Sequence, residues 1–168
     1  MAYSWRCAQG SGGGQVVTMD GVTHDVGKWD LLIAHPPCTH LAVSGARWFA
    51  EGRKPLSLRY EAAAFFMKFA EAEIPQIAIE NPVCVMSTLY RKPDQIINPW
   101  QFGHPEQKKT ALWLKNLPLL QETNNVYKYM MTLPEKEKAK IWWLGSNHSK
   151  ERSKTYPGIA NAMAEQWG

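Results

Sequence analysis

The sequence contains no apolar run that approaches the roughly 18 residues of a membrane-spanning helix. It also opens without the charged and apolar pattern of a signal peptide. Its three cysteines, Cys7, Cys38 and Cys84, form no disulfide framework, and no repeat or low-complexity tract occurs. These absences argue against membrane contact, a disulfide-stabilised scaffold and a repeat architecture. They favour a single domain in a reducing cytoplasm.

The composition is typical of a globular domain, with 45% hydrophobic and 20% charged residues. The eight tryptophans suit either a core or the stacking of nucleic-acid bases. The formal net charge of +4 lies in one segment, because residues 124–154 hold seven basic and three acidic residues. This excess fits a contact with a polyanion, and a solvated surface loop explains it equally well.

Residues 31–34, Leu-Leu-Ile-Ala, form a short apolar run that predicts a strand buried on both faces. Residues 35–37, His-Pro-Pro, end the strand, because proline donates no hydrogen bond to a sheet. Cys38 follows at the carboxyl end of the strand, where open α/β sheets bind their ligands. The position favours a nucleophilic thiol. The alternative is a small buried side chain, which is the commoner role of a free cysteine.

The residues around this strand predict a hairpin and a βαβ unit. Residues 16–26 are rich in β-branched residues on both sides of an Asp-Gly pair, which indicates a hairpin. Residues 57–73 have a helical pattern and residues 76–79 predict the next strand. The apolar stripe of the helix consists of Leu58, Ala62, Phe65 and Phe69. Polar residues 80 and 81 and a proline then follow the second strand.

The remainder of the chain predicts two more strands and two helices. A short strand is expected within residues 96–102 and another at residues 111–114, with a short helix at residues 134–143. The last helix is expected to be capped by Thr155, with Pro157 in its first turn. Its apolar face consists of Ile159, Met163 and Trp167. Alternating strands and helices predict an α/β fold.

Two polar groups therefore follow two parallel strands, the Cys38 thiol and the Glu80 carboxyl, and they should face one crevice. A thiolate beside a carboxylate suits acyl transfer poorly, because histidine usually serves as the base there. It does suit an electrophilic heterocycle. A thiolate that adds to ring carbon 6 of a pyrimidine needs an acid at ring nitrogen 3, and the addition makes ring carbon 5 nucleophilic.

Several motifs, in order, resemble those of the DNA (cytosine-5)-methyltransferases. Residues 36–38, Pro-Pro-Cys, match the family's Pro-Cys nucleophile turn, and residues 80–82, Glu-Asn-Pro, are similar to its Glu-Asn-Val motif. Residues 102–114 resemble its Tyr-Gly-x-Pro-Gln-x-Arg-x-Arg run, which leads into a strand. The Ala-His-Pro-Pro-Cys-Thr stretch and the Pro-Gly-Ile-Ala-x-Ala-Met-Ala ending are similar to the small phage-encoded branch, whose members would act in the bacterial host cytoplasm. The resemblance spans residues 19–168.

The resemblance implies that Cys38 adds to a flipped cytosine, with Glu80 as the acid at ring nitrogen 3. Lys108 stands where the family has its first arginine, which holds the carbonyl oxygen of the base. Thr110 replaces the second arginine, and Asn81 is implied to brace the loops. The methyl donor would be S-adenosylmethionine.

The resemblance and the charge pattern also assign binding residues. Residues expected to contact DNA are Thr39, Ser44, Arg47, Asn81, Lys109, Thr110, Lys136, Lys138, Lys140, Lys150, Arg152 and Lys154. Residues expected beside S-adenosylmethionine are Pro36, Pro37, Pro157 and Gly158. Because a catalytic thiolate must be stabilised, Arg47 and Lys108 are further expected to lie near Cys38.

One departure from the family concerns the cofactor. The family's Phe-x-Gly-x-Gly loop and the acidic residues that follow its next strands do not occur in this sequence. The fold implied is therefore the C-terminal half of a doubly wound, Rossmann-like methyltransferase sheet with an N-terminal hairpin. An N-terminal partner fragment or a longer natural start would supply the cofactor loop. Within the single domain, residues 1–28 are irregular with a hairpin, 29–122 form the sheet core, 123–154 the basic recognition-like segment, and 155–168 the terminal helix.

Two alternatives stay open from the sequence. The first is a DNA-binding remnant that keeps the fold and does not methylate. The second is a metal site made by His35, Cys38 and His40 with Cys7 or His24, although these spacings are not those of a paired-cysteine zinc site. Cys84 is expected to be packed rather than reactive.

Overall fold

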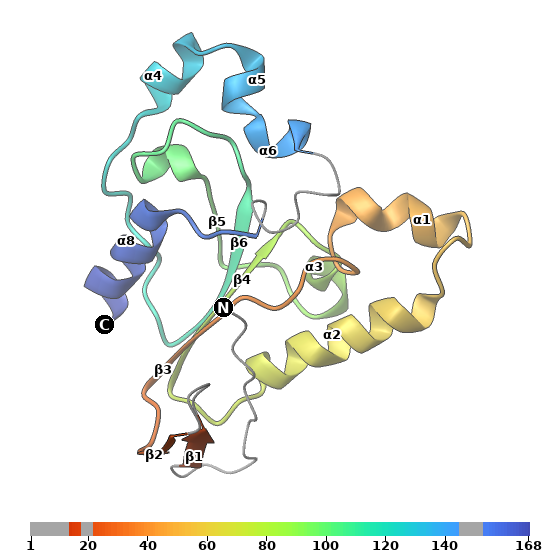
Figure 1. Cartoon of the computed structure of the whole chain (residues 1–168), viewed down its shortest axis with the longest axis vertical. Coiled ribbons are helices and arrows are strands. Elements are labelled where there is room, and N and C mark those ends of the chain that lie inside the picture. The colour runs from red at the N-terminus through yellow and green to blue at the C-terminus, as the bar shows by residue number, and fades with distance from the viewer. Residues whose placement is uncertain (1–13, 18–21, 145–152) are drawn as a thin grey trace.

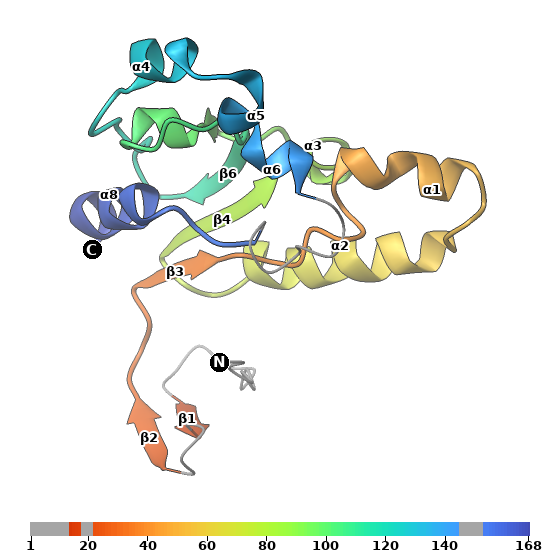
Figure 2. The same ribbon diagram turned by 45° about the horizontal axis from the view of Figure 1, so that its top comes forward.

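The computed structural model describes residues 14–17, 22–144 and 153–168 (Figure 1). Strands β1 (Gly14–Val17) and β2 (Thr23–Val26) pair antiparallel, with Val16 opposite His24. This confirms the strands of the predicted hairpin, whose turn lies outside the described residues. Figures 1 and 2 show the hairpin apart from the larger sheet, to which residues 27–30 connect it.

A parallel βαβ unit forms the first part of the larger sheet. Strands β3 (Leu31–Ala34) and β4 (Gln76–Pro82) are parallel, with Leu31 opposite Gln76 and Ala34 opposite Ile79. Helix α2 (Leu56–Ala70) connects them and ends three residues before the predicted end. The unit is confirmed as predicted from the apolar runs on both sides of the helix.

The second part of the sheet is antiparallel. Strand β6 (Thr110–Lys115) pairs with β4 on one side and with β5 (Gln95–Ile97) on the other, which gives the order β3-β4-β6-β5. The fold is therefore α/β with a mixed four-stranded sheet. The strand predicted within residues 96–102 is wrong in its second half. Pro99–Gln101 is instead a 3-10 helix (η2), because Pro99 donates no hydrogen bond and the Gln101 side chain accepts one from the Asn98 N–H at 2.7 Å.

Helices cover both faces of this sheet (Figures 1 and 2). Alternate side chains of β4 and β6 point to opposite faces, so one cluster packs under α2 and the other under α8 (Pro157–Trp167). The α2 side includes Phe66, Ile77, Ile79, Ala111 and Trp113, and the α8 side includes Ala78, Leu112, Leu114, Ile159, Met163 and Trp167. The face predicted for the terminal helix is confirmed.

The predicted stripe of α2 is wrong at Phe65, because the neighbouring Phe66 is the buried residue. Phe66 is fully buried and its ring meets that of Trp113 edge-on at 5.2 Å, whereas Phe65 is 43% exposed. The cause is that Phe66, not Phe65, lies over the large ring of the central strand β6. Of the predicted stripe, Ala62 and Phe69 do pack against this cluster.

The remaining helices are short. They are η1 (Val43–Gly45), α1 (Ala46–Ala50), α3 (Met86–Leu89), α4 (Tyr127–Thr132), α5 (Glu135–Lys138) and α6 (Lys140–Trp143). The single helix predicted for residues 134–143 is divided at Ala139, which leaves the helical conformation. The predicted Thr155 cap is also wrong, because Tyr156 occupies the cap position and no side chain caps the helix. In the described ranges, no helix is long and apolar enough to cross a membrane.

Candidate functional site

The loop after β3 carries Cys38 in a tight turn. The carbonyl of Cys38 accepts hydrogen bonds from the N–H groups of Leu41 and Ala42 at 3.0 and 2.9 Å. Cys38 is half-buried, and its neighbours in the chain, Pro37 and Thr39, are exposed. The thiol therefore lies within the first turn beyond the carboxyl end of the strand, where it was predicted.

His35 and Glu80 meet at the same edge of the sheet. His35 follows Ala34 as Glu80 follows Ile79, so the parallel register of β3 and β4 places them side by side. His35 Nδ1 lies 2.9 Å from Glu80 Oε2, and the side chains are 42% and 16% exposed. Glu80 was predicted to follow β4 and instead lies inside it, because β4 stays paired with β6 as far as Pro82.

Asn81 joins the two strand ends. It is buried, and its Nδ2 donates a 2.8 Å hydrogen bond to the carbonyl of Pro36. Its Oδ1 is buried without a hydrogen-bond partner. Because the Pro36 carbonyl lies two residues before Cys38, the amide fixes the start of the thiol loop relative to Glu80, its neighbour in β4. Asn81 is thus placed to brace the loops and not to contact DNA.

The loops beyond the two strands also pair with each other. The Val43 N–H donates to the Val83 carbonyl at 3.3 Å, and the Val85 N–H donates to the Leu41 carbonyl at 3.0 Å. Cys84, which lies between these bonds, is 2% exposed. Burial raises the pKa of its thiol, and the nearby Cys38 thiol adds to the rise. Cys84 is therefore packed, as predicted.

A second cluster joins the loop before β6 to the start of α8. The Gly158 N–H donates to His104 Nε2 at 3.0 Å, and the Tyr156 hydroxyl donates to Glu106 Oε2 at 2.7 Å. The rings of His104 and Tyr156 lie 5.2 Å apart. Burial raises the pKa of Tyr156, and the hydrogen bond to Glu106 raises it further. The cluster fixes the entry into the terminal helix.

Lys108 lies at the edge of this second cluster. Its Nζ is 3.4 Å from the carbonyl of Lys154 and 5.7 Å from the centre of the Tyr156 ring. Thr110, two residues later, is opposite Pro82, so Lys108 approaches the sheet edge where β4 ends. Thr110 is buried and its hydroxyl donates to the Lys108 carbonyl at 3.2 Å. This position leaves Thr110 no surface for the predicted DNA contact.

The four residues expected beside S-adenosylmethionine do not form a binding site. A Cβ on Gly158 would lie 2.0 Å from the Phe102 carbonyl oxygen, and the Gly158 N–H is already bonded to His104. Pro36 is buried with its carbonyl bonded to Asn81, while Pro37 and Pro157 are exposed rings without a donor. These residues offer no free hydrogen-bond donor and no carboxylate to an adenosyl group, so they do not fit the cofactor.

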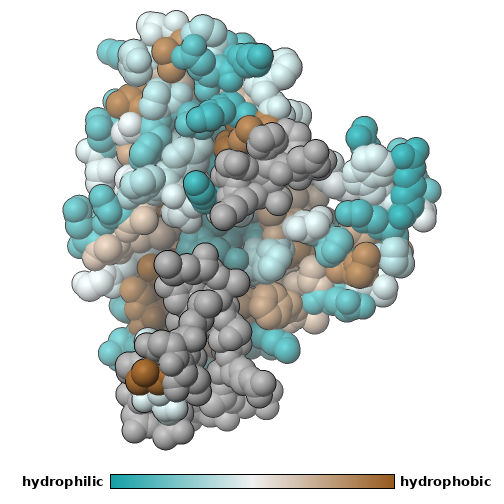
Figure 3. Space-filling view, viewed as in Figure 1, coloured by the Kyte–Doolittle hydropathy of each residue, from teal (hydrophilic) through white to brown (hydrophobic). Residues whose placement is uncertain are grey.

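The remaining predicted DNA contacts lie on several surfaces. Thr39, Ser44, Arg47, Lys109, Lys136, Lys140 and Lys154 are exposed, whereas Lys138 is mostly covered and pairs with Glu135 at 2.9 Å. Lys150 and Arg152 lie outside the described residues. Arg47 is on α1, where its guanidinium lies 4.5 Å over the Trp48 ring. In Figure 3 the part of the surface over α4 and α5 is mainly hydrophilic, with isolated hydrophobic residues.

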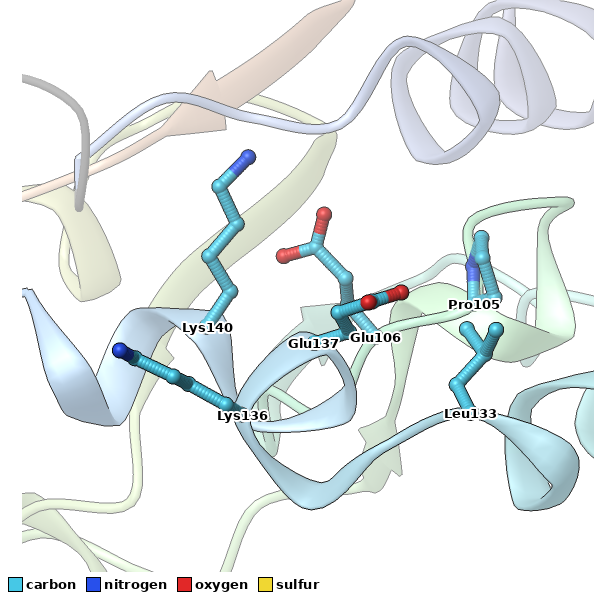
Figure 4. Close-up of a pocket in the computed structure, with 6 residues that line it drawn as sticks. All are labelled: Pro105, Glu106, Leu133, Lys136, Glu137 and Lys140. Carbon is cyan, nitrogen blue, oxygen red and sulfur yellow. The ribbon is translucent and has the colours of Figure 1, made fainter.

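Lys136 and Lys140 line an open pocket of about 350 Å³ beside the second cluster (Figure 4). Their side chains extend to one end of the pocket, and Pro105 and Leu133 close the other. Two carboxylates also line it, those of Glu106 and Glu137. The local charge is therefore balanced, and a phosphate contact here depends on lysine amino groups that reach past the carboxylates.

His35 and His40, two of the proposed metal ligands, have other partners. His35 pairs with Glu80, and the ring of His40 lies edge-on against Phe49 at 6.2 Å. Among the described residues, no group of three or more His, Cys, Asp or Glu side chains could hold a metal ion. Cys7 lies outside those residues, and the side chain of His24 is not described.

Within these clusters, His104 and Glu106 had no predicted role, and His35 was considered only as a metal ligand. The contact of His35 with Glu80 follows from the register of β3 and β4, in which Ala34 is opposite Ile79. The contact of His104 with the helix start depends on the path of residues 103–106 and leaves no pattern in the sequence. Compared with models of known families, with curated proteins and with solved structures, the chain gives no match.

Proposed function

We propose that this chain is a DNA (cytosine-5)-methyltransferase-like protein, in which the Cys38 thiolate adds to a cytosine that has been flipped out of a duplex. The observation that carries the proposal is the shared sheet edge: the Cys38 loop follows β3, Glu80 lies near the end of the neighbouring parallel strand β4, and Asn81 donates a hydrogen bond to the Pro36 carbonyl. A nucleophile and an acid are thereby held on one rigid scaffold, as addition to a pyrimidine requires.

In the proposed step, the sulfur of Cys38 forms a bond to ring carbon 6, the double bond between carbons 5 and 6 becomes one between carbons 4 and 5, and the electron pair of the bond between carbon 4 and nitrogen 3 moves to nitrogen 3. Glu80 gives a proton to ring nitrogen 3, which absorbs the electron pair that the addition pushes into the ring. The Lys108 amino group, which lies 3.4 Å from the Lys154 carbonyl, would hold the carbonyl oxygen at ring carbon 2. Carbon 5 becomes nucleophilic and can take up a proton or another electrophile.

Part of the sheet topology supports a more specific fold, the doubly wound sheet of methyltransferases. A βαβ unit with ligands at its carboxyl edge is the repeating unit of doubly wound folds, and β3, α2 and β4 have that order. We propose that the sheet corresponds to the C-terminal half of a methyltransferase sheet, with β6 as an inserted antiparallel strand. Cytoplasmic action and contact with DNA belong to the same proposal.

Methyl transfer needs S-adenosylmethionine, and the residues expected to hold it do not fit it. This observation favours the second candidate, a DNA-binding remnant that does not methylate. Both candidates bind DNA, and they differ in whether Cys38 reacts with a cytosine.

The test uses DNA with deuterium at cytosine carbon 5 and needs no cofactor. After addition, carbon 5 takes a proton from water, the deuteron leaves, and the carbon–sulfur bond breaks to restore cytosine. We expect loss of deuterium, measured by mass spectrometry, with the native chain and none with Cys38→Ala or Glu80→Gln. A native chain that leaves the deuterium in place on every duplex and single-stranded substrate would overturn the proposal and support the remnant.

A second arm measures tritiated methyl transfer into duplex DNA. We expect little transfer by the 168-residue chain, and weak binding of S-adenosylmethionine in calorimetry. An N-terminal fragment with the family's glycine loop, added in trans, should then raise transfer. Robust transfer by the chain alone, abolished by Cys38→Ala, would contradict the misfit of the cofactor residues and establish the enzyme.

A further inference from the structure

We propose that His35 is a positioning residue for Glu80, a role that rests on the proposed function. The imidazole donates a hydrogen bond from Nδ1–H to one carboxyl oxygen, so that the other oxygen carries the proton destined for the base. None of the family-like motifs assigns a role to His35. The inference comes from the 2.9 Å contact between Nδ1 and Oε2.

The backbone fixes this contact. The register of β3 and β4 places the two residues at the same level, and both side chains point to the face that α8 covers. On the other side of β4, the residue opposite Glu80 is Leu112, which is apolar and buried. The Glu80 carboxyl therefore has a polar neighbour, His35, on the β3 side and an apolar neighbour, Leu112, on the β6 side.

The difference in exposure gives the pair a direction. The Glu80 side chain is 16% exposed, and that of His35 is 42% exposed. The imidazole thus connects a largely covered carboxyl to water, with Nδ1 toward the carboxyl. Neutral imidazole carries one N–H, and a bond from Nδ1–H to Glu80 leaves Nε2 as the acceptor on the exposed side.

This arrangement defines the proton balance. With Oε2 occupied by the Nδ1–H bond, the acidic proton of Glu80 resides on Oε1 and passes to ring nitrogen 3 when Cys38 adds. The Nδ1–H bond then stabilises the carboxylate that forms, because hydrogen bonds to charged groups are the stronger ones. When the adduct collapses, ring nitrogen 3 returns its proton to Oε1 and the imidazole is unchanged.

The first arm of the test reads the tautomer of His35 and does not depend on activity. With 15N-labelled histidine at a fixed neutral pH, His35 should carry its proton on Nδ1, and the His35→Asn protein identifies its signals. Glu80→Ala should return the ring to the Nε2–H form that free imidazole prefers in water. Glu73→Ala, which removes an exposed carboxylate elsewhere, is the control. A tautomer that is the same with and without Glu80 would overturn the inference.

The second arm uses deuterium exchange at cytosine carbon 5 with two matched variants. His35→Phe keeps a ring without a donor, and we expect exchange to fall about ten- to a hundredfold. His35→Asn keeps an amide donor near the position of Nδ1, and it should recover most of the rate. A purely structural role would not distinguish the two, provided that both melt as the native chain does.

The outcomes separate the two proposals. Absence of exchange in the native chain refutes the proposed function, and with it the role of His35 in that reaction. Exchange in the native chain that is equally fast in His35→Phe refutes the role of His35 alone. If His35→Phe does not fold, His35→Asn and the tautomer measurement decide. The inference is contradicted if His35→Asn exchanges slowly and if the tautomer of His35 is the same in the native chain and in Glu80→Ala.

Discussion

The two cysteines that the structure describes differ in accessibility, and this difference can be tested directly. Cys38 is half-buried in its turn, whereas Cys84 is in the core with its thiol pKa raised by burial. We expect limiting iodoacetamide to label Cys38 ahead of Cys84 in the native protein, as peptide mass mapping would show. In denaturant the two should react alike. Labelling of Cys38 only after unfolding would remove it as a nucleophile.

Asn81 gives a prediction about stability. Asn81→Ala leaves the Pro36 carbonyl without its donor in a covered site, which costs about 1–3 kcal/mol of unfolding free energy. The replacement also removes the buried Oδ1, which has no hydrogen-bond partner, and this loss stabilises the folded chain. The expected decrease in unfolding free energy therefore lies in the lower part of the range. Urea denaturation measures the change. Asn161→Ala, the same replacement at an exposed helical position, should cost nothing, and an equal cost at both sites would contradict the bracing role.

Tyr156 predicts a dependence of stability on alkaline pH. Its pKa in the folded state is above the value of about 10 that it takes in the unfolded chain. Its contribution is therefore complete below about pH 10 and is lost as the pH rises further, because the unfolded chain then releases the proton first. Tyr156→Phe should lose about 1 kcal/mol at neutral pH, with its bond to Glu106. Above about pH 10 its stability should fall less steeply than that of the native chain.

The measurement is urea denaturation at a series of pH values, with Tyr60→Phe at an exposed position as the control. The control should follow the native curve throughout. Identical alkaline slopes for the native chain and Tyr156→Phe would show that the hydroxyl of Tyr156 is not buried in solution.

At the scale of elements, the apolar runs predicted β3, the core of β4 and β6, and the βαβ connection, because burial on both faces leaves a run without polar interruption. The continuation of β4 through Glu80 and Asn81 was not predictable in this way. Polar residues do not end a strand while its neighbour still offers hydrogen bonds, and β6 pairs as far as Pro82. The contact of His35 with Glu80 depends on strand register, which neither strand specifies alone.

The start of α8 supplies a prediction at this scale. A Cβ at Gly158 would meet the Phe102 carbonyl at 2.0 Å, so the helix and the loop before β6 must separate to accept it. We expect Gly158→Ala to cost about 1–3 kcal/mol of unfolding free energy. Gly27→Ala, where nothing lies within 4 Å, is the matched control and should be neutral or slightly stabilising. A Gly158→Ala protein as stable as the control would contradict the close packing.

At the scale of the whole molecule, the charge pattern predicts duplex binding that is weak and sensitive to salt. The basic segment is short, and the carboxylates of Glu106 and Glu137 lie among its lysines. Replacing Lys136, Lys140 and Lys154 by alanine should lower the slope of log affinity against log salt by about 0.9 for each phosphate that the variant no longer neutralises. Lys68→Ala, on the opposite layer of the molecule, should leave the slope unchanged. An unchanged slope in the triple variant would move the DNA surface elsewhere.

The order of the sheet has a consequence for how it can grow. In the described part of the chain, β3 pairs on one side only, so a row of backbone N–H and C=O groups faces outward along Leu31–Ala34. Such an edge is a template for another strand, whether from a second copy or from a complementing segment. A strand added at β5, the other edge, would extend the sheet on the side away from β4. A parallel strand added at β3 would end one strand spacing, about 5 Å, from the loop that carries Cys38.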